Sequence, residues 1–153
     1  PLAAQMLRLQ TPEILAVTCT LPDGTEGGFG MVGMLDQPVT LEECARYVKS
    51  VFRIPEVKVF GDRNQKVQRV ALLPGSGKSM VADALDKKAD VYISGDFGHH
   101  DGLDAVDQGL PVIDAGHYGI EHIFIAQMEE ELKERFPGLT IFSEPIVHPF
   151  TCI

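Results

Sequence analysis

The sequence contains few cysteines and no long hydrophobic run. Its three cysteines, Cys19, Cys44 and Cys152, are widely spaced and form no CxxC pair, which argues against a disulfide framework and a zinc ribbon. No stretch reaches the roughly 20 apolar residues of a membrane-spanning helix, and the first residues lack the apolar core of a signal peptide. We therefore expect a cytoplasmic protein with reduced thiols and no membrane contact.

Basic residues are also scarce. The 153 residues include 13 lysines and arginines against 22 aspartates and glutamates, which gives a net charge of −9. Since there is no basic stripe, the electrostatic field repels a phosphate backbone, and nucleic acid is not an expected partner. The 44% hydrophobic content suffices for one core, and the length predicts a single domain over 1–153.

The first 38 residues are predicted to form the end of a helix followed by a hairpin. Residues 14–20 and 29–35 are runs of strand-forming residues, joined by a turn-like sequence at 22–25. The chain starts with a proline inside a helical pattern rather than with methionine. We therefore expect it to be a fragment of a longer chain.

Helical and strand patterns alternate along the rest of the chain. Thr40 and Glu43 have the spacing of a capping box, which predicts a helix over 41–52. Alternation of this kind needs crossover connections, which predict an α/β fold: a layered fold with a mostly parallel sheet flanked by helices. The predicted strands are 57–60, 67–73, 90–94, 112–115 and 139–142, and the later helices are 79–88, 99–108 and 118–136.

Two glycine-rich motifs resemble nucleotide-binding loops. Residues 28–33 spell GxGxxG, but no helical pattern follows, so a glycine-rich strand or bulge explains them equally well. The segment that begins at Gly75 and ends at Ser79 closes in GKS, but Leu72 stands where a P-loop requires glycine. A tight strand-to-helix turn and a degenerate nucleotide site both remain open for this segment.

The loop after the predicted strand 90–94 combines acids and histidines, among them Asp96, His99 and His100. In open α/β sheets, ligands bind beyond the carboxyl ends of the strands. Asp96 and His100 are therefore candidates to move protons in a catalytic site. A packed histidine at position 99 and a solvated polar face around His100 are the structural alternatives.

The strongest pattern follows the predicted strand 112–115. His117 lies just beyond the strand end, and Glu121 follows four residues later on the same side of a helix, so that imidazole and carboxylate can converge on one cation. Glu121 is in register with Met128, which predicts a buried carboxylate that needs a partner, whereas His122 is predicted on the outer face. A His–Glu hydrogen bond or an arginine partner is the alternative to a metal.

Two side chains alone do not hold a catalytic metal. Three or more protein ligands are usual for such sites. Either Asp96, His100 or Asp114 completes the set, or the missing ligands lie outside this sequence.

In their order along the chain, these motifs resemble the C-terminal half of the Nif-three-like proteins, also called GTP cyclohydrolase I type II homologues. The resemblance extends from about Gly28 to the last residue. It rests on Gly75-Ser76-Gly77, on the run from Asp90 to Asp96 with His100, on Asp114-Ala115-Gly116-His117-Tyr118 with Glu121, on Ser143-Glu144 and on Pro149-Phe150.

Membership in this family would imply one lobe of a two-lobed α/β protein, with two metal ions between the lobes and assembly into a hexamer. The family residues that match His117 and Glu121 are metal ligands, and the family's N-terminal lobe supplies the others. That lobe is therefore an expected partner, as is a homo-oligomer. The family name refers to a ring-opening reaction on GTP, but the resemblance does not determine the small-molecule substrate.

Our leading hypothesis is a divalent-metal-dependent hydrolase of which this chain is the C-terminal lobe. Two ions of zinc, iron or manganese would lower the pKa of a bridging water, with His117 and Glu121 as ligands and Asp96 or His100 moving protons. In this chain alone we expect an incomplete site. The alternatives are a non-catalytic oligomeric scaffold with a structural metal and a degenerate nucleotide-binding protein.

Overall fold

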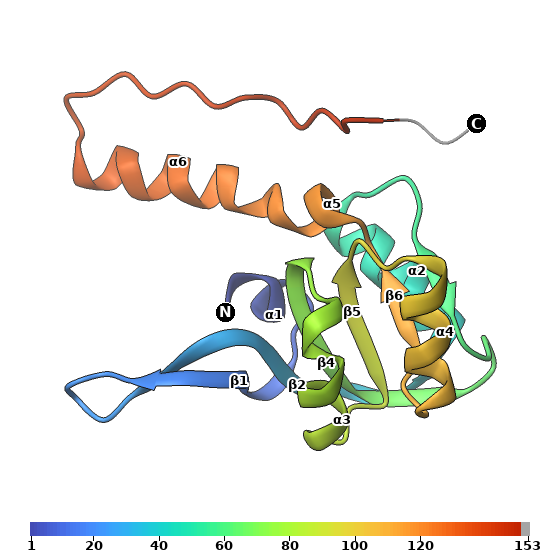
Figure 1. The fold of residues 1–153 in the computed structure, drawn as a ribbon. Helices are drawn as coiled ribbons and strands as arrows, with labels where there is room; N and C mark the ends of the chain where they lie inside the picture. The colour runs from blue at the N-terminus through green and yellow to red at the C-terminus, as the bar shows by residue number, and fades with distance from the viewer. Residues whose placement is uncertain (151–153) are drawn as a thin grey trace.

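A six-stranded sheet forms the centre of the molecule, with the strand order β1-β2-β4-β5-β6-β3. The computed structural model describes residues 1–150 (Figure 1). The strands are β1 (Gln10–Thr20), β2 (Glu26–Thr40), β3 (Lys58–Phe60), β4 (Lys66–Ser76), β5 (Val91–Gly95) and β6 (Val112–Asp114). The helices are α1 (Leu2–Met6), α2 (Leu41–Phe52), α3 (Val81–Asp86), α4 (His99–Asp107), α5 (His117–Glu121) and α6 (Ile123–Arg135), and a 3-10 turn, η1, spans Lys78–Met80.

The α/β class is confirmed, but the prediction of a mostly parallel sheet is wrong. Only the central strands β4, β5 and β6 run parallel to one another. The pairs β1–β2, β2–β4 and β3–β6 are antiparallel. The short turn between β1 and β2 reverses the chain directly, and a strand pair joined in this way is antiparallel. The crossover argument therefore holds for the three central strands alone.

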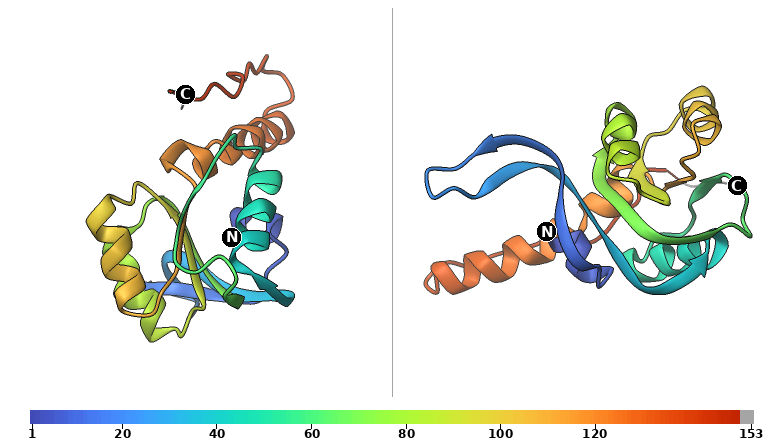
Figure 2. Two further views of the ribbon diagram at one scale, coloured as in Figure 1. Left: turned by 90° about the vertical axis from the view of Figure 1, so that its right-hand side faces the viewer. Right: turned by 90° about the horizontal axis from the view of Figure 1, so that it is seen from below.

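Helices cover both faces of the sheet, as Figure 2 shows with α1 and α2 on one side and α3 and α4 on the other. Successive side chains of a strand point to opposite faces, so each central strand contributes to both cores. Toward α1 and α2 the sheet buries Val70, Leu72, Val91, Ile93 and Ile113. Toward α3 and α4 it buries Ala71, Tyr92 and Val112.

The predicted capping box is confirmed at the start of α2. The Glu43 amide donates to Thr40 Oγ1 at 3.1 Å, and the Thr40 amide donates to Glu43 Oε2 at 2.7 Å. These two bonds satisfy amides that have no partner within the helix. The helix runs over Leu41–Phe52, the predicted range.

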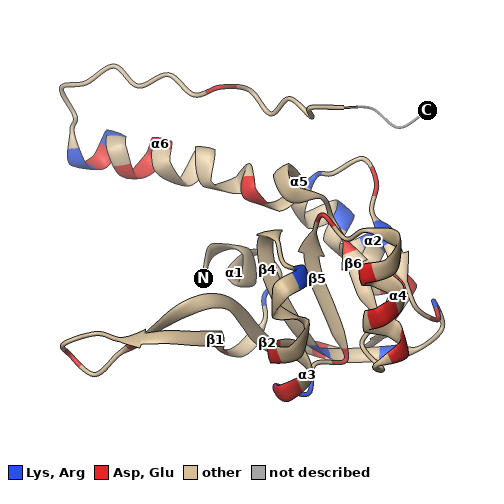
Figure 3. Cartoon of the chain, viewed as in Figure 1, with Lys and Arg blue, Asp and Glu red and all other residues tan. Residues whose placement is uncertain are grey.

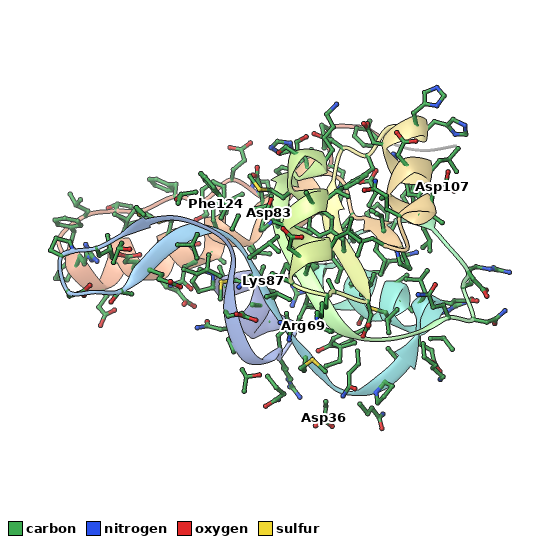
Figure 4. The ribbon with its side chains drawn as sticks, turned by 60° about the horizontal axis from the view of Figure 1, so that its bottom comes forward. Asp36, Arg69, Asp83, Lys87, Asp107 and Phe124 are labelled. Carbon is green, nitrogen blue, oxygen red and sulfur yellow. The ribbon has the colours of Figure 1, made fainter. Side chains whose placement is uncertain are left out.

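The β1–β2 hairpin extends from the body and is anchored at its base by ion pairs. Glu13 lies 2.6 Å from an Arg69 nitrogen and 3.0 Å from Lys87 Nζ, and Figure 4 labels the two cationic residues at the base of the hairpin. Hydrogen bonds from Lys87 and Arg69 lower the pKa of Glu13. The GxGxxG residues lie within β2, where a Cβ on Gly28 would lie 2.0 Å from the Ala16 carbonyl oxygen. The glycine-rich strand is therefore the correct interpretation of that motif.

The predicted helix 118–136 is divided in two, and its second part leaves the body of the protein. His122 separates α5 from α6, and α6 projects outward with residues 136–150 returning beside it (Figure 1). No residue of α6 is buried, and Phe124 and Met128 are 58% and 41% exposed. Residues 139–142 form no strand. The helical wheel assumed a core beneath this segment, and that core is missing in residues 1–150.

The surface of the described residues mixes both signs of charge. Figure 3 shows lysine and arginine positions separated by acidic and uncharged segments, with three acidic positions along α4. None of the helices within residues 1–150 combines the length and the apolar character required to cross a membrane.

Candidate metal site

His117 and Glu121 meet at one end of the sheet, where α5 follows β6. His117 Nε2 lies 3.0 Å from Glu121 Oε2, and the two side chains are 51% and 43% exposed. The spacing of four residues on a helix therefore brings the two groups together. The predicted burial of Glu121 is wrong, because α5 ends at this residue and the next helix, α6, projects away from the core (Figure 1).

Asp96 contacts the opposite edge of the same imidazole. It follows β5 with a positive φ of 59°, an uncommon conformation for a residue other than glycine, and its Oδ2 lies 2.9 Å from His117 Nδ1. A carboxylate at Nδ1 favours the tautomer that carries its proton there, which leaves Nε2 free to accept or to ligate. The hydrogen bond to Asp96, together with the negative charge of Glu121, raises the pKa of His117.

Asp96→Asn is expected to lower the pKa of His117 in the metal-free protein, because an amide does not stabilise the imidazolium as a carboxylate does. The raised pKa means that the protonated pair stabilises the fold below the ordinary histidine pKa and that this contribution is lost as the pH rises through the raised value. An NMR titration of the His117 ring measures the change. A pKa that is the same in both proteins would contradict the assigned hydrogen bond.

The glycine-rich segment at the end of β4 packs against the His117–Glu121 pair. Gly75 has a φ of +79°, and a Cβ there would lie 2.6 Å from Glu121 Oε1 and 3.4 Å from His117 Nε2. The helix that follows η1, α3, has only six residues, and Lys78 Nζ lies 3.8 Å from Asp101 Oδ2. The position of Gly75 thus relates this loop to the His–Glu pair, whereas nucleotide binding by this loop stays a prediction.

Gly75→Ala is expected to displace the Glu121 carboxylate, since 2.6 Å is shorter than a real Cβ contact and the positive φ adds strain. We expect weaker metal binding by the full-length protein, about 10-fold or more by analogy with the loss of a residue that orients a ligand. Isothermal titration with Zn²⁺ measures it. Gly138→Ala is a suitable control, because a Cβ at Gly138 meets no atom within 4 Å. Equal affinity in both variants would contradict the role of Gly75.

The structure does not bring His100 to this site. His100 is exposed at the start of α4, with its ring centroid 5.2 Å from that of His99, and no hydrogen bond or ion pair within residues 1–150 joins it to His117 or Glu121. The role of His100 as a proton carrier stays a prediction. His122, predicted on the outer face, is instead 5% exposed, and its Nε2 lies 2.8 Å from the Phe52 carbonyl oxygen.

The donor atoms fit part of a metal site. An imidazole nitrogen and a carboxylate oxygen 3.0 Å apart can both reach an ion at the usual bond length of about 2.0–2.2 Å. Within residues 1–150, however, no group of three or more His, Cys, Asp or Glu side chains could hold a metal ion. A complete coordination shell therefore needs ligands from other chain segments or from solvent.

Two cavities flank the pair. One of about 560 Å³ is lined by His117, Asp96, Tyr118 and Lys58, among others. The other, of about 690 Å³, has Glu121 at its border and lies against the β1–β2 hairpin and α6. A small molecule can therefore approach the imidazole and the carboxylate from different sides.

Comparison with known proteins identifies the family. A family model for Duf34/NIF3 (NGG1p interacting factor 3) matches residues 2–149. The GTP cyclohydrolase 1 type 2 homolog of Staphylococcus aureus strain MSSA476 is 38% identical over 109 residues, which are 71% of this chain and 30% of the relative. The homolog of Halalkalibacterium halodurans is 35% identical over 136 residues, 86% of this chain and 36% of the relative. The matched region thus spans about a third of these relatives.

Solved structures share the fold of this chain. The Bacillus cereus protein related to NIF3 matches with a TM-score of 0.86 and 20% identity over 99% of this chain and 68% of that chain. At that identity the match shows the fold alone. Reduced HcgD from Methanocaldococcus jannaschii matches with a TM-score of 0.64 and 30% identity over 87% of this chain and 50% of that chain. The resemblance found in the motifs is confirmed: this chain belongs to the Duf34/NIF3 family.

Proposed function

We propose that this chain forms part of a divalent-metal-dependent hydrolase in which His117 and Glu121 are metal ligands. The observation that supports the proposal is that His117 Nε2 and Glu121 Oε2 lie 3.0 Å apart while Asp96 is hydrogen-bonded to Nδ1 of the same imidazole. This arrangement has the form of a carboxylate–histidine–metal triad, in which the outer carboxylate orients the ligating imidazole.

The residues of this chain have distinct roles in the proposal. Asp96 accepts a hydrogen bond from the protonated Nδ1 of His117, which leaves the Nε2 lone pair on the side of Glu121. Gly75 leaves room for the Glu121 carboxylate. A bound divalent ion supplies Lewis acidity and lowers the pKa of water. Asp96 is in this view an orienting residue rather than the proton carrier predicted from the sequence, whereas His100 stays a prediction for proton transfer.

The composition of the intact site is also a proposal. Zinc, iron and manganese suit a histidine–carboxylate pair about equally. By family resemblance we propose two such ions, further ligands from an N-terminal lobe, and a homo-oligomeric, cytoplasmic protein. GTP is the first substrate to test, because the curated relatives carry the name GTP cyclohydrolase 1 type 2 homolog.

The proposal is tested on the full-length protein. The protein is stripped with a chelator, reloaded with Zn²⁺, Mn²⁺ or Fe²⁺, and incubated with GTP and with a panel of esters and amides. We expect hydrolysis only after reloading. Water-proton relaxation by the Mn²⁺-loaded protein reports whether open coordination positions exist. A tightly held metal with a closed shell and no turnover would contradict the hydrolase and favour the scaffold.

A further inference from the structure

Asp114 is the most enclosed acid near the site. Its side chain is 1% exposed and lies 2.6 Å from Lys58 Nζ. Lys58 extends from the edge strand β3, is 65% exposed, and donates a second bond to the Phe97 carbonyl oxygen at 3.1 Å. A charge buried this completely is costly unless it is paired and hydrogen-bonded. The ion pair explains how the carboxylate is tolerated, but not why it lies here.

The other contacts of Asp114 lead to both loops of the candidate site. Its Oδ1 accepts a hydrogen bond from the Gly116 amide at 2.9 Å, and its Oδ2 accepts one from the Phe97 amide at 3.2 Å. Gly116 directly precedes His117, and Phe97 directly follows Asp96. One carboxylate therefore fixes the backbone beside each partner of the Asp96–His117 hydrogen bond.

The Asp96 loop needs such a constraint. Asp96 has a φ of +59°, and residues in sparsely populated backbone regions persist only where the surroundings hold them. The bond from the next amide, that of Phe97, to Asp114 is a direct restraint on this conformation. Without it, the loop can relax toward ordinary φ values and withdraw the Asp96 carboxylate from the imidazole.

We infer that Asp114 is a positioning residue that sets the imidazole of His117 for metal binding by fixing the Asp96 loop and the Gly116 turn together. The inference rests on the proposed function for its consequence, weaker metal binding, but the geometry concerns this chain alone. Asp114 does not ligate the ion in this account, because its two oxygens are already engaged by Lys58 and two amides.

A double-mutant cycle with Asp96 tests this inference. Zn²⁺ affinity of the full-length protein is measured for Asp114→Asn, Asp96→Asn and the combination of both. We expect Asp114→Asn to weaken binding by about 10- to 100-fold, the usual effect of losing an outer-shell partner of a metal ligand. In the Asp96→Asn background, Asp114→Asn should weaken Zn²⁺ binding by a clearly smaller factor, because the effects of two residues that act through one another are not additive. Asp107→Asn, on an exposed position of α4 that Figure 4 labels, is the matched control and should leave the affinity unchanged.

Two further measurements separate the possible outcomes. Should Asp114→Asn fail to fold, the variant Lys58→Met/Asp114→Asn, which removes both paired charges, takes its place in the double-mutant cycle with Asp96→Asn. Crystal structures of the metal-free proteins should show the Asp96–His117 bond lost in the Asp114 variant, and this readout stands even when the wild type binds no metal and the proposed function fails. An intact Asp96–His117 bond in the variant, or equal losses of affinity in both Asp96 backgrounds, would overturn the inference.

Discussion

His117→Ala in the full-length protein is expected to reduce bound divalent metal to background and to abolish metal-dependent hydrolysis. Alanine removes the Nε2 donor that lies 3.0 Å from Glu121, and loss of a ligand should exceed the roughly 10- to 100-fold loss of affinity typical of its outer-shell partners. Elemental analysis after gel filtration measures the metal content, and titration with Zn²⁺ measures the affinity.

The matched control is His99→Ala. His99 is exposed on α4 beside His100, so the substitution removes an imidazole without touching the proposed ligands. His99→Ala should retain wild-type metal content. Equal metal content in the His117 variant and the wild type would show that the ion, if any, is held elsewhere.

His122→Ala is expected to lower the free energy of unfolding by about 3 kcal/mol, because it leaves a cavity and an unpaired buried carbonyl. The His122 side chain is almost fully buried, bonds the Phe52 carbonyl at 2.8 Å and lies near the rings of Tyr118 and His148. Chemical denaturation followed by circular dichroism measures the change. Metal affinity should fall much less than in the His117 variant.

Two further variants serve as controls for the loss of stability expected in His122→Ala. His122→Gln can still donate a hydrogen bond to the Phe52 carbonyl and should lose less stability than alanine. His100→Ala, on an exposed position, should stay within about 0.5 kcal/mol of the wild type, as surface substitutions usually do. A loss below about 1 kcal/mol for His122→Ala would contradict its role as a structural histidine.

Local signals predicted much of the fold. The Thr40–Glu43 spacing gave the start of α2, and the apolar runs located all six strands and the turn of the hairpin, with ends that differ by a few residues. They also predicted one strand, at 139–142, that does not form. These features depend on neighbouring residues, so the sequence is enough to find them. The i, i+4 spacing likewise brought His117 and Glu121 together.

Features that depend on distant contacts were not predictable in this way. Periodicity assigned Glu121 to the buried face and His122 to the surface, but the break at His122 and the projection of α6 reverse the two. The predicted hairpin gave the antiparallel direction of β1 against β2. The antiparallel pairs β2–β4 and β3–β6 were missed, because the alternation of helices and strands does not determine which strands pair. The contact of Asp96 with His117 spans 21 residues and requires a left-handed backbone conformation that a sequence pattern does not reveal.

The most direct test is an anomalous diffraction map from crystals of the full-length protein grown with Zn²⁺ or Mn²⁺. The account predicts a metal peak within bonding distance of both His117 Nε2 and the Glu121 carboxylate, about 2.0–2.2 Å away, with Asp96 still bonded to Nδ1. A metal bound to other side chains, or a Glu121 carboxylate paired with an arginine in place of an ion, would contradict it.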